Sequence, residues 1–302
     1  MKKKKAPIFP LLFFVLFPLV LLGGGLVICY RITGFSTAKI YSELHYNENW
    51  ETDPLTQSGY KQLVEKIFPQ TYYYLASGAH CYVFISEDKR YVLKFFKTKH
   101  LFPKEWLSFF SFLRRLTGRL EVGTQFFSER IFASYKSAYD MLRNESGLVY
   151  MHLNKKREFR IKVSLIDNKG KKHYVDLDEV EFVVQKKAVK IFDHLHALIK
   201  QQDQEGLEAA IRSFLQLIAI RCEKGFTNQD IALKNHYGFI GNHAIQMNCD
   251  SLIPDNSMKY PMNFREEVLQ AAKRLDLWAS QNQPELSFFI QSEAQRIIQG
   301  AF

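Results

Sequence analysis

The sequence predicts an α+β protein in which a small β-rich region precedes a helical region. Three observations carry this prediction. Short runs rich in β-branched and aromatic residues, separated by turn residues, occupy 71–184. Long stretches with apolar residues at helical spacing occupy much of 185–302. An uncharged apolar run, 6–30, precedes both regions, and a chain of 302 residues is long enough to bury a sizeable core.

The apolar run predicts a membrane anchor within residues 1–34. As a helix, residues 6–30 would extend roughly 37 Å at about 1.5 Å per residue, enough to cross a hydrocarbon core of about 30 Å with some tilt. The run is longer than the apolar part of a secretory signal peptide, and no A-x-A-like cleavage site follows it. We therefore expect an uncleaved single-pass anchor, with the lipid bilayer as partner through 6–30.

The charges beside this run predict its orientation. Four lysines, Lys2 to Lys5, precede it, whereas Arg31 and Lys39 are the nearest charges behind it. The positive-inside rule then keeps the N-terminus in the cytoplasm and places the folded part on the extracytoplasmic side. That location conflicts with any use of ATP, which is a cytoplasmic nucleotide.

Composition narrows the classes of partner. The net charge of +10 suits an anionic membrane surface or a phosphorylated ligand. The sequence contains no RNA-binding signature and no zinc-finger spacing, so we expect no nucleic-acid partner. The cysteines lack C-x-x-C spacing, which predicts neither a zinc site nor a disulfide framework; they are Cys29, Cys81, Cys222 and Cys249.

Residues 35–70 predict a polar linker that ends in a short amphipathic helix, 59–68. Three strands follow at 71–76, 81–86 and 91–96. The next segment, 100–120, is apolar on most faces and ends in arginines. It is either a buried helix or a helix at the membrane interface, where Trp, Phe and Arg are common.

The rest of the β-rich region predicts a helix at 124–143 and strands at 147–153, 158–166 and 173–184. A basic cluster flanks these strands and is either a solvated face or a contact for an anionic surface; it comprises Lys155, Lys156, Arg157, Arg160, Lys162, Lys169, Lys171 and Lys172. Two helices, 185–201 and 204–224, open the helical region, which continues through a small hairpin to a helical tail.

Two short motifs in the β-rich region suggest a phosphate-binding hairpin. The first, "LASGAHCYVF" at 75–84, places small residues including Gly78 at the turn between two strands, where the backbone can approach a phosphate. The second, "YVLK", places Lys94 in the third strand. Together they resemble the glycine-rich hairpin and lysine strand of the protein-kinase-like fold. The resemblance implies a two-lobed protein, with 71–184 as the β-rich N-lobe and 185–302 as the helical C-lobe.

In that family the lysine holds the α- and β-phosphates of ATP, and an acid on the following helix orients it. The resemblance therefore implies nucleotide-binding roles for Gly78, Lys94 and Glu129, with Asp140 as the alternative acid.

A third motif, "NQDIALKN" at 228–235, resembles the kinase catalytic loop H-x-D-x-x-x-x-N, with asparagine in place of the histidine. It implies that Asp230 accepts the proton of the attacking hydroxyl and that Asn235 ligates Mg²⁺. A hairpin then ends where the family has its metal-binding D-F-G. Spacing puts Asn248 in the aspartate position, whereas a slightly longer hairpin would put Asp250 there. ATP and Mg²⁺ are the implied cofactors.

No A-P-E motif follows, and only a short helical tail remains, so a peptide-docking subdomain is largely missing. The sequence therefore predicts a membrane-anchored kinase-like protein. It is either an atypical phosphotransferase acting on a small molecule or a lipid-linked sugar, or a nucleotide-binding pseudokinase. The alternative is a non-catalytic exported α+β interaction domain tethered to the membrane, with an unknown protein or small-molecule partner. The segment 134–154 also resembles uncharacterised membrane-anchored proteins of obligate intracellular bacteria, which implies no activity.

Overall fold

The computed structural model describes residues 34–41, 46–52, 55–97, 124–154, 156–230 and 232–301. The predicted anchor, 6–30, and the apolar segment 100–120 lie outside these residues, so both remain predictions. Within the described ranges, no helix combines the length and the apolar character that crossing a membrane requires.

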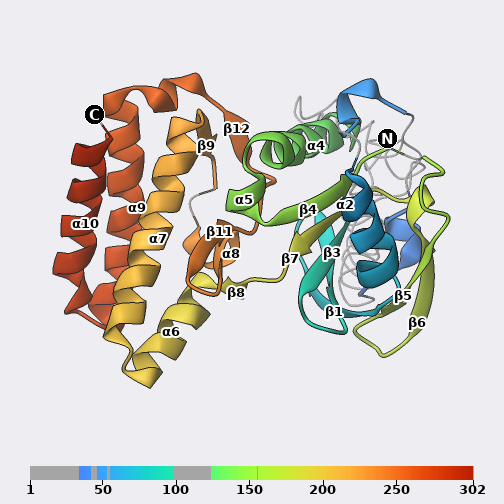
Figure 1. The fold of residues 1–302 in the computed structure, drawn as a ribbon, viewed down its shortest axis with the longest axis horizontal. Coiled ribbons are helices and arrows are strands. Elements are labelled where there is room, and N and C mark those ends of the chain that lie inside the picture. Colours follow the sequence, from blue (N-terminus) through green and yellow to red (C-terminus); the bar gives the residue numbers. More distant parts are fainter. Residues whose placement is uncertain are drawn as a thin grey trace, which may run out of the picture.

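Two lobes lie side by side, one built on a sheet and one on helices, and they are connected through the segment from β7 to β8 (Figure 1). The predicted α+β class is confirmed. The sheet lobe contains a short helix and turn, α2 (Gln57–Gln62) and η3 (Leu63–Ile67), then β1 (Thr71–Ser77), β2 (Cys81–Ser86), β3 (Tyr91–Phe96), α4 (Thr124–Met141), α5 (Arg143–Ser146), β4 (Leu148–His152), β5 (Lys162–Ile166), β6 (Lys172–Asp176) and β7 (Phe182–Lys186).

These strands form one sheet in the order β4-β7-β3-β2-β1-β5-β6. Neighbouring strands are antiparallel except β1 and β5, which run parallel. Strand β3 lies between β2 and β7, and all its residues are buried. Side chains alternate between the two faces of a strand. Leu93 and Phe95 therefore join the large aromatic core on one face, while Lys94 and Phe96 face α4 and the helical lobe.

Two predicted strands differ from the observed ones. The predicted strand 158–166 begins only at Lys162, because the Asp178 carboxylate accepts the backbone N–H groups of residues 158–160 and holds them in a turn. The predicted strand 173–184 is two strands, β6 and β7, separated by the turn η4 (Leu177–Glu179). Apolar residues are buried on both sides of this turn, among them Val175 before it and Phe182 after it. The apolar pattern of the sequence therefore did not reveal the turn.

The aromatic core of the sheet lobe contains a buried histidine, His152, whose ring packs against the rings of Phe159 and Phe182. Burial lowers its pKa from the ordinary 6.5 to about 4. The unfolded chain therefore takes up a proton near pH 6.5 that the folded protein does not accept until about pH 4. Stability contributed by the neutral ring is complete above pH 6.5 and is lost as the pH falls through this window.

We expect this histidine to lower the free energy of unfolding by about 2 kcal/mol between pH 8 and pH 5. Urea unfolding at both pH values measures the change, and His152→Phe should remove this share because phenylalanine does not titrate. The comparison with the parent protein isolates this share, because the other titrating groups are the same in both proteins. Equal pH dependence in the variant and the parent protein would contradict the assignment.

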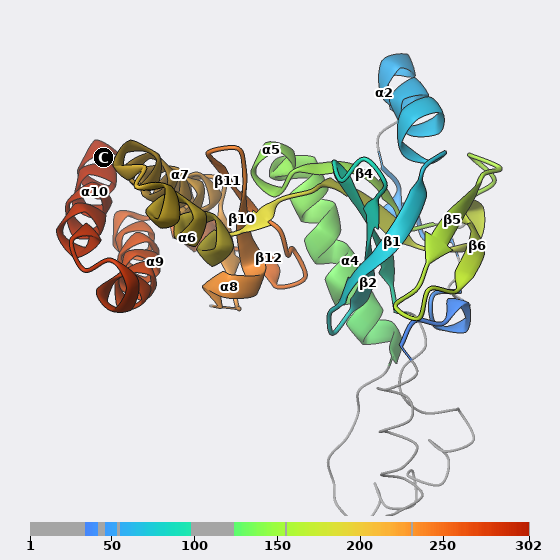
Figure 2. The ribbon, with the colours of Figure 1, turned by 90° about the horizontal axis from the view of Figure 1, so that it is seen from below.

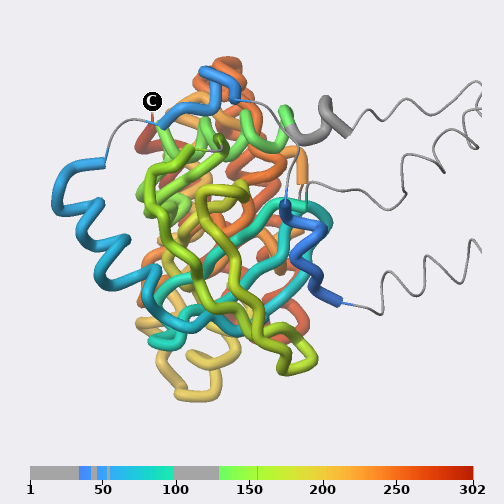
Figure 3. The backbone as a smooth tube through the Cα atoms, turned by 90° about the vertical axis from the view of Figure 1, so that its right-hand side faces the viewer, coloured from blue at the N-terminus to red at the C-terminus, as the bar shows by residue number. Residues whose placement is uncertain are grey.

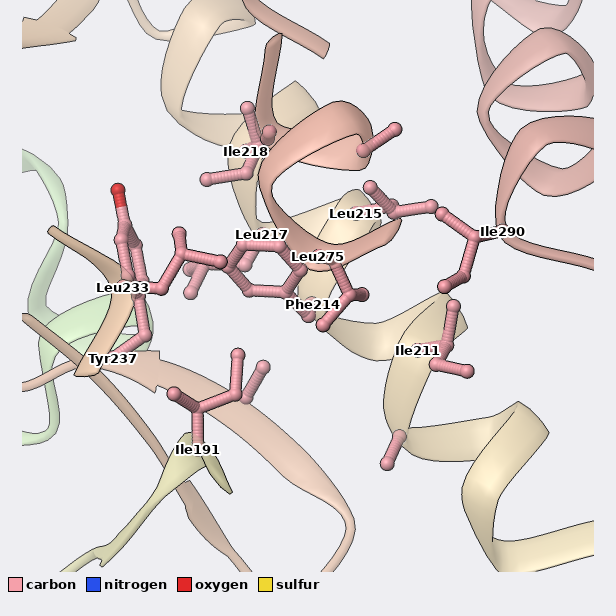
Figure 4. Close-up of a cluster of buried hydrophobic side chains, with 14 of the residues drawn as sticks. Ile191, Ile211, Phe214, Leu215, Leu217, Ile218, Leu233, Tyr237, Leu275 and Ile290 are labelled. Atoms are coloured by element: carbon pink, nitrogen blue, oxygen red, sulfur yellow. The ribbon is translucent and has the colours of Figure 1, made fainter. Parts of the chain in front are cut away.

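The helical lobe is built from four helices around one apolar core: α6 (Ile191–Gln201), α7 (Gln204–Glu223), α9 (Pro261–Asn282) and α10 (Leu286–Gly300). Figure 4 shows side chains of these helices packed around Phe214 and Leu275. Shorter elements lie on the side of these helices that faces the sheet lobe: β8 (Val189–Lys190), β9 (Phe226–Asn228), α8 (Leu233–His236), β10 (Tyr237–Ile240), β11 (His243–Gln246), β12 (Leu252–Pro254) and η5 (Asn256–Lys259).

Candidate functional site

Lys94 lies where the two lobes meet. Its side chain is only 7% exposed, and its ammonium Nζ donates a hydrogen bond to the Met247 carbonyl oxygen at 2.6 Å. Gln185 of β7 donates to the same oxygen at 3.1 Å. The Lys94 ammonium also lies 6.0 Å from the centre of the Tyr135 ring on α4. The lysine strand is thus connected to the segment that follows β11, although 153 residues separate the two partners.

Glu129, the predicted acidic partner, does not pair with Lys94: among the described residues, Lys94 forms no ion pair within 4.0 Å. The α4 side chain that the Lys94 ammonium faces is that of Tyr135. Glu129 is six residues earlier, roughly 9 Å along the helix axis. The alternative acid, Asp140, is exposed and pairs with Lys136 at 2.5 Å.

The segment after β11 carries both predicted metal positions. The Asn248 Oδ1 accepts a hydrogen bond from the Tyr135 hydroxyl at 3.4 Å. Cys249 is fully buried among α4 side chains, and Asp250 follows it. The Asp250 Oδ2 lies 3.5 Å from Nε2 of His80, which stands in the turn between β1 and β2. Asn248 therefore contacts α4, whereas Asp250 contacts His80 in the turn between β1 and β2. The buried Cys249 lies between them in the sequence.

The β1–β2 turn is held by hydrogen bonds to its own backbone, and the Gly78 N–H donates to the Cys81 carbonyl oxygen at 2.9 Å. Gly78 is exposed, and a Cβ added to it would meet only the Cys81 carbonyl oxygen at 3.8 Å. The protein itself therefore imposes no steric need for glycine here. Lys97 donates from its ammonium to the Gly78 carbonyl at 2.6 Å and to the Ser77 hydroxyl at 2.8 Å.

Asp230 follows β9, and its side chain is 48% exposed. Its Oδ2 lies 2.9 Å from Nε2 of the buried His236, and its Oδ1 accepts the Ala232 N–H at 2.9 Å. The His236 carbonyl oxygen in turn accepts the Met247 N–H at 2.7 Å. Three contacts therefore connect the two predicted ends of the site, from Lys94 through Met247 and His236 to Asp230. Asn235 lies beside His236 on α8 and is exposed.

A buried polar network positions the backbone of this site from within the helical lobe. Arg221 of α7 is 2% exposed; it donates to the Tyr237 hydroxyl at 2.6 Å and forms an ion pair with Glu267. The Tyr237 ring packs in the apolar core, and its hydroxyl points out of that core (Figure 4). This hydroxyl accepts a hydrogen bond from Asn228 at 3.4 Å.

Asn228 stands where the kinase-like pattern has histidine, and it joins the segment of Asp230 to the segment that follows Asn248. Its Oδ1 accepts the Ser251 hydroxyl at 2.6 Å and the Asp230 N–H at 3.3 Å. The pairing of β9 with β12 sets Asn228 opposite Leu252. Residues 228–230 and 248–252 are thereby held side by side.

Sequence reasoning missed four residues of this region: His80, Gln185, Arg221 and His236. Each makes its contact with a residue that is distant in the sequence or lies across a loop. An approximate signal existed only for His236, since it directly follows Asn235 of the loop motif.

The predicted metal ligands carry oxygen donors, which suit magnesium better than a soft metal. Asp250, Asn248 and Asn235 offer oxygen atoms, and Mg²⁺ is usually held by one or two protein carboxylates together with phosphates and water. The nearby thiols do not compete as thiolate ligands, because burial raises the pKa of Cys81 and raises that of Cys249 to about 12. Across the described ranges, no three His, Cys, Asp or Glu residues are grouped for metal binding.

Comparison with known proteins found no matching family model and no matching curated protein. Among solved structures, the chain is similar to WbdD in complex with the kinase inhibitor LY294002, with a TM-score of 0.35 and 14% identity over 75% of this chain and 45% of that one. A medium-resolution structure of the bifunctional kinase-methyltransferase WbdD gives a TM-score of 0.33 and 14% identity, with coverages of 73% and 43%. A high-resolution WbdD structure gives 0.32 and 15%, with coverages of 73% and 44%.

The chain thus spans less than half the length of each WbdD chain. At these scores the likeness assigns neither a family nor an activity to this chain.

Proposed function

We propose that this chain is a kinase-like protein that binds Mg²⁺ and ATP between its two lobes. The observation that carries the proposal is the hydrogen bond from the Lys94 ammonium to the Met247 carbonyl oxygen at 2.6 Å. It brings the single buried lysine of β3 next to the segment that holds Asn248 and Asp250. The order of elements also supports the proposal: a small-residue hairpin, a lysine strand, a helix, and then an Asp–Asn loop in the helical lobe.

In this proposal Lys94 supplies the cation for the α- and β-phosphates, and the Gly78 turn supplies backbone that a phosphate can approach. Asp250, or Asn248 as its alternative, and Asn235 would supply oxygen ligands for Mg²⁺, which neutralises the charge of the β- and γ-phosphates. Binding requires that Lys94 leaves the Met247 carbonyl and that His80 leaves Asp250.

The lysine environment favours nucleotide binding over ordinary kinase turnover. Lys94 bonds to a carbonyl oxygen, whereas an active protein kinase pairs the lysine with a carboxylate on the neighbouring helix. A nucleotide-binding pseudokinase is therefore our first candidate.

Phosphoryl transfer is the second candidate, and the geometry of Asp230 favours it. This carboxylate is half exposed, and it is oriented by His236 and by the Ala232 N–H. An oriented, accessible carboxylate can accept the proton of an attacking hydroxyl. The acceptor would be a small molecule or a lipid-linked sugar. We also propose that residues 6–30 anchor the protein in a membrane.

Thermal unfolding of the full-length protein in detergent, with and without nucleotide and Mg²⁺, tests the function. We expect ATP to raise the melting temperature, and Mg²⁺ to increase that rise. Asp250→Ala should remove the Mg²⁺-dependent part, because the strongest oxygen ligand is lost, while Glu205→Ala, at an exposed acid of α7, should leave it unchanged. No shift with any nucleoside triphosphate would overturn the proposal. Release of ADP that Asp230→Asn abolishes would select the second candidate.

A further inference from the structure

The β5–β6 hairpin is a basic projection that the proposed nucleotide site does not use. Strand β6 ends the seven-stranded sheet, on the side away from the helical lobe (Figures 1 and 2). Viewed from that side, the hairpin lies at the front of the molecule (Figure 3). We define its tip as residues 167–174.

The tip turns its positive charges outward and its acid inward. Lys169, Lys171 and Lys172 are exposed. Asp167 is 8% exposed; its carboxylate accepts the backbone N–H groups of Lys169 and Lys171 and lies 2.8 Å from the His173 ring nitrogen. This acid is occupied in holding the turn, so it does not present its charge beside the lysines.

An exposed aromatic side chain accompanies these lysines. Tyr174 is 62% exposed, and the Lys172 ammonium lies 5.2 Å from the centre of its ring. A lysine cluster beside an exposed tyrosine suits the headgroup layer of a bilayer, where amphipathic rings and cations are both stable.

The hairpin tip lies where the chain arrives from the apolar run 6–30. Gly34 begins the described structure, and a Cβ added to it would come within 2.5 Å of the Asn168 side chain in the tip. The ring of Phe35 makes an edge contact with the His173 ring, with centroids 5.3 Å apart. Residues 31–33 separate Gly34 from the end of the run, so the connection spans at most roughly 14 Å from Tyr30 to Gly34.

The second apolar segment, 100–120, connects to the same end of the sheet. Because β1 and β5 run parallel, the turn after β5 and the turn after β1 point the same way. Lys97, which ends the described residues before that segment, bonds to Ser77 and Gly78 in the β1–β2 turn. The described residues that adjoin the two apolar stretches, Gly34 and Lys97, therefore lie at the end of the sheet lobe toward which the basic tip points.

We infer that the tip of the β5–β6 hairpin docks on the anionic phospholipid headgroups of the bilayer in which residues 6–30 are anchored. Gly34 lies beside Asn168 of the tip and at most roughly 14 Å along the chain from Tyr30, so an anchor at 6–30 would hold the tip near the bilayer surface. The field of that surface extends over a Debye length of about 8 Å at physiological salt, and long lysine side chains add to the reach of the tip. Each lysine near an anionic surface strengthens such a contact by roughly fivefold. The inference rests on the predicted anchor and is independent of nucleotide binding.

The test measures lysine reactivity in the full-length protein reconstituted into vesicles. A membrane-impermeant amine reagent labels vesicles of phosphatidylcholine alone and vesicles of phosphatidylcholine mixed with phosphatidylglycerol, and mass spectrometry reads each lysine. We expect Lys169, Lys171 and Lys172 to label at least about fivefold more slowly in the anionic vesicles. Lys200 and Lys273, exposed in the helical lobe, should label equally in both and normalise for orientation. High salt should abolish the difference.

Equal labelling of the tip in both vesicle types would overturn the inference. So would protection of the tip by added polyglutamate without protection by anionic vesicles, since the surface would then recognise an acidic polypeptide. The triple variant Lys169→Glu, Lys171→Glu, Lys172→Glu gives an independent readout. A fluorescent label is placed at position 174 in this variant and in the parent protein. In the variant the label should be more accessible to aqueous quenchers than in the parent protein, and only in anionic vesicles. The matched charge reversal Lys200→Glu, Lys273→Glu should leave that accessibility unchanged.

Discussion

Lys94→Met is expected to weaken Mg²⁺-dependent ATP binding by about 100-fold and to remove the nucleotide-induced rise in melting temperature. Methionine keeps the length of the side chain but removes the ammonium, and a hydrogen bond between charged groups contributes about 1.5–3 kcal/mol. The fold should survive, because Gln185 also donates to the Met247 carbonyl at 3.1 Å and keeps that oxygen satisfied. Isothermal calorimetry with ATP and Mg²⁺ measures the affinity.

The matched control for this variant is Lys66→Met, which removes an exposed lysine from the same lobe. It should bind ATP as the parent protein does. If Lys94→Met bound ATP with unchanged affinity, Lys94 and the neighbouring Met247 segment would not form the nucleotide site, even if nucleotide stabilised the protein elsewhere.

Arg221→Met should lower the free energy of unfolding by about 3 kcal/mol. Arg221 is 2% exposed and bonds both to the Glu267 carboxylate and to the Tyr237 hydroxyl. Breaking a buried ion pair by removing one partner costs about 3–5 kcal/mol, because the remaining charge is left unpaired. The lower end applies here, since the Glu267 side chain is 25% exposed and water can reach it. Urea unfolding measures the loss.

A double-mutant cycle separates the ion pair from the packing of the arginine stem. Glu267→Gln alone leaves a neutral partner, and the double variant with Arg221→Met should recover a large part of the loss. Arg221→Met should also weaken the support of the loop at Asp230. Arg221 holds the Tyr237 hydroxyl, and Asn228 links that hydroxyl to the loop. Additive losses in the cycle would show that the ion pair contributes nothing beyond packing.

Several features of the site were predictable because their signals are local. The β-branched and aromatic residues of 91–96, bounded by turn residues, placed Lys94 in a strand, and that strand lies in the middle of the sheet. The apolar spacing of 204–224 predicted the long helix α7, and Gly225, at a φ of +77°, follows its end. The loop carrying Asp230 and the hairpin after it also lie where their patterns indicated.

Other features depended on partners that no local pattern names. Asn248 and Asp250 were alternatives for one metal position, and the structure directs one to Tyr135 and the other to His80. Glu129 satisfied a helical-acid pattern, yet the α4 residue beside Lys94 is Tyr135. A strand rule could not anticipate that β5 would pair in parallel with β1 and bring Asn168 beside Gly34.

The sequence by itself determined the α+β class, the succession of strands and helices, and the residue types available for phosphate and metal. These depend on periodicity and turn chemistry, which act over a few residues. Only the tertiary structure decided that Lys94 meets Met247, that His236 meets Asp230, and that the basic tip lies beside Gly34. Partners far apart in the chain are selected by how sheets and helices pack, so their pairing is a property of the whole fold.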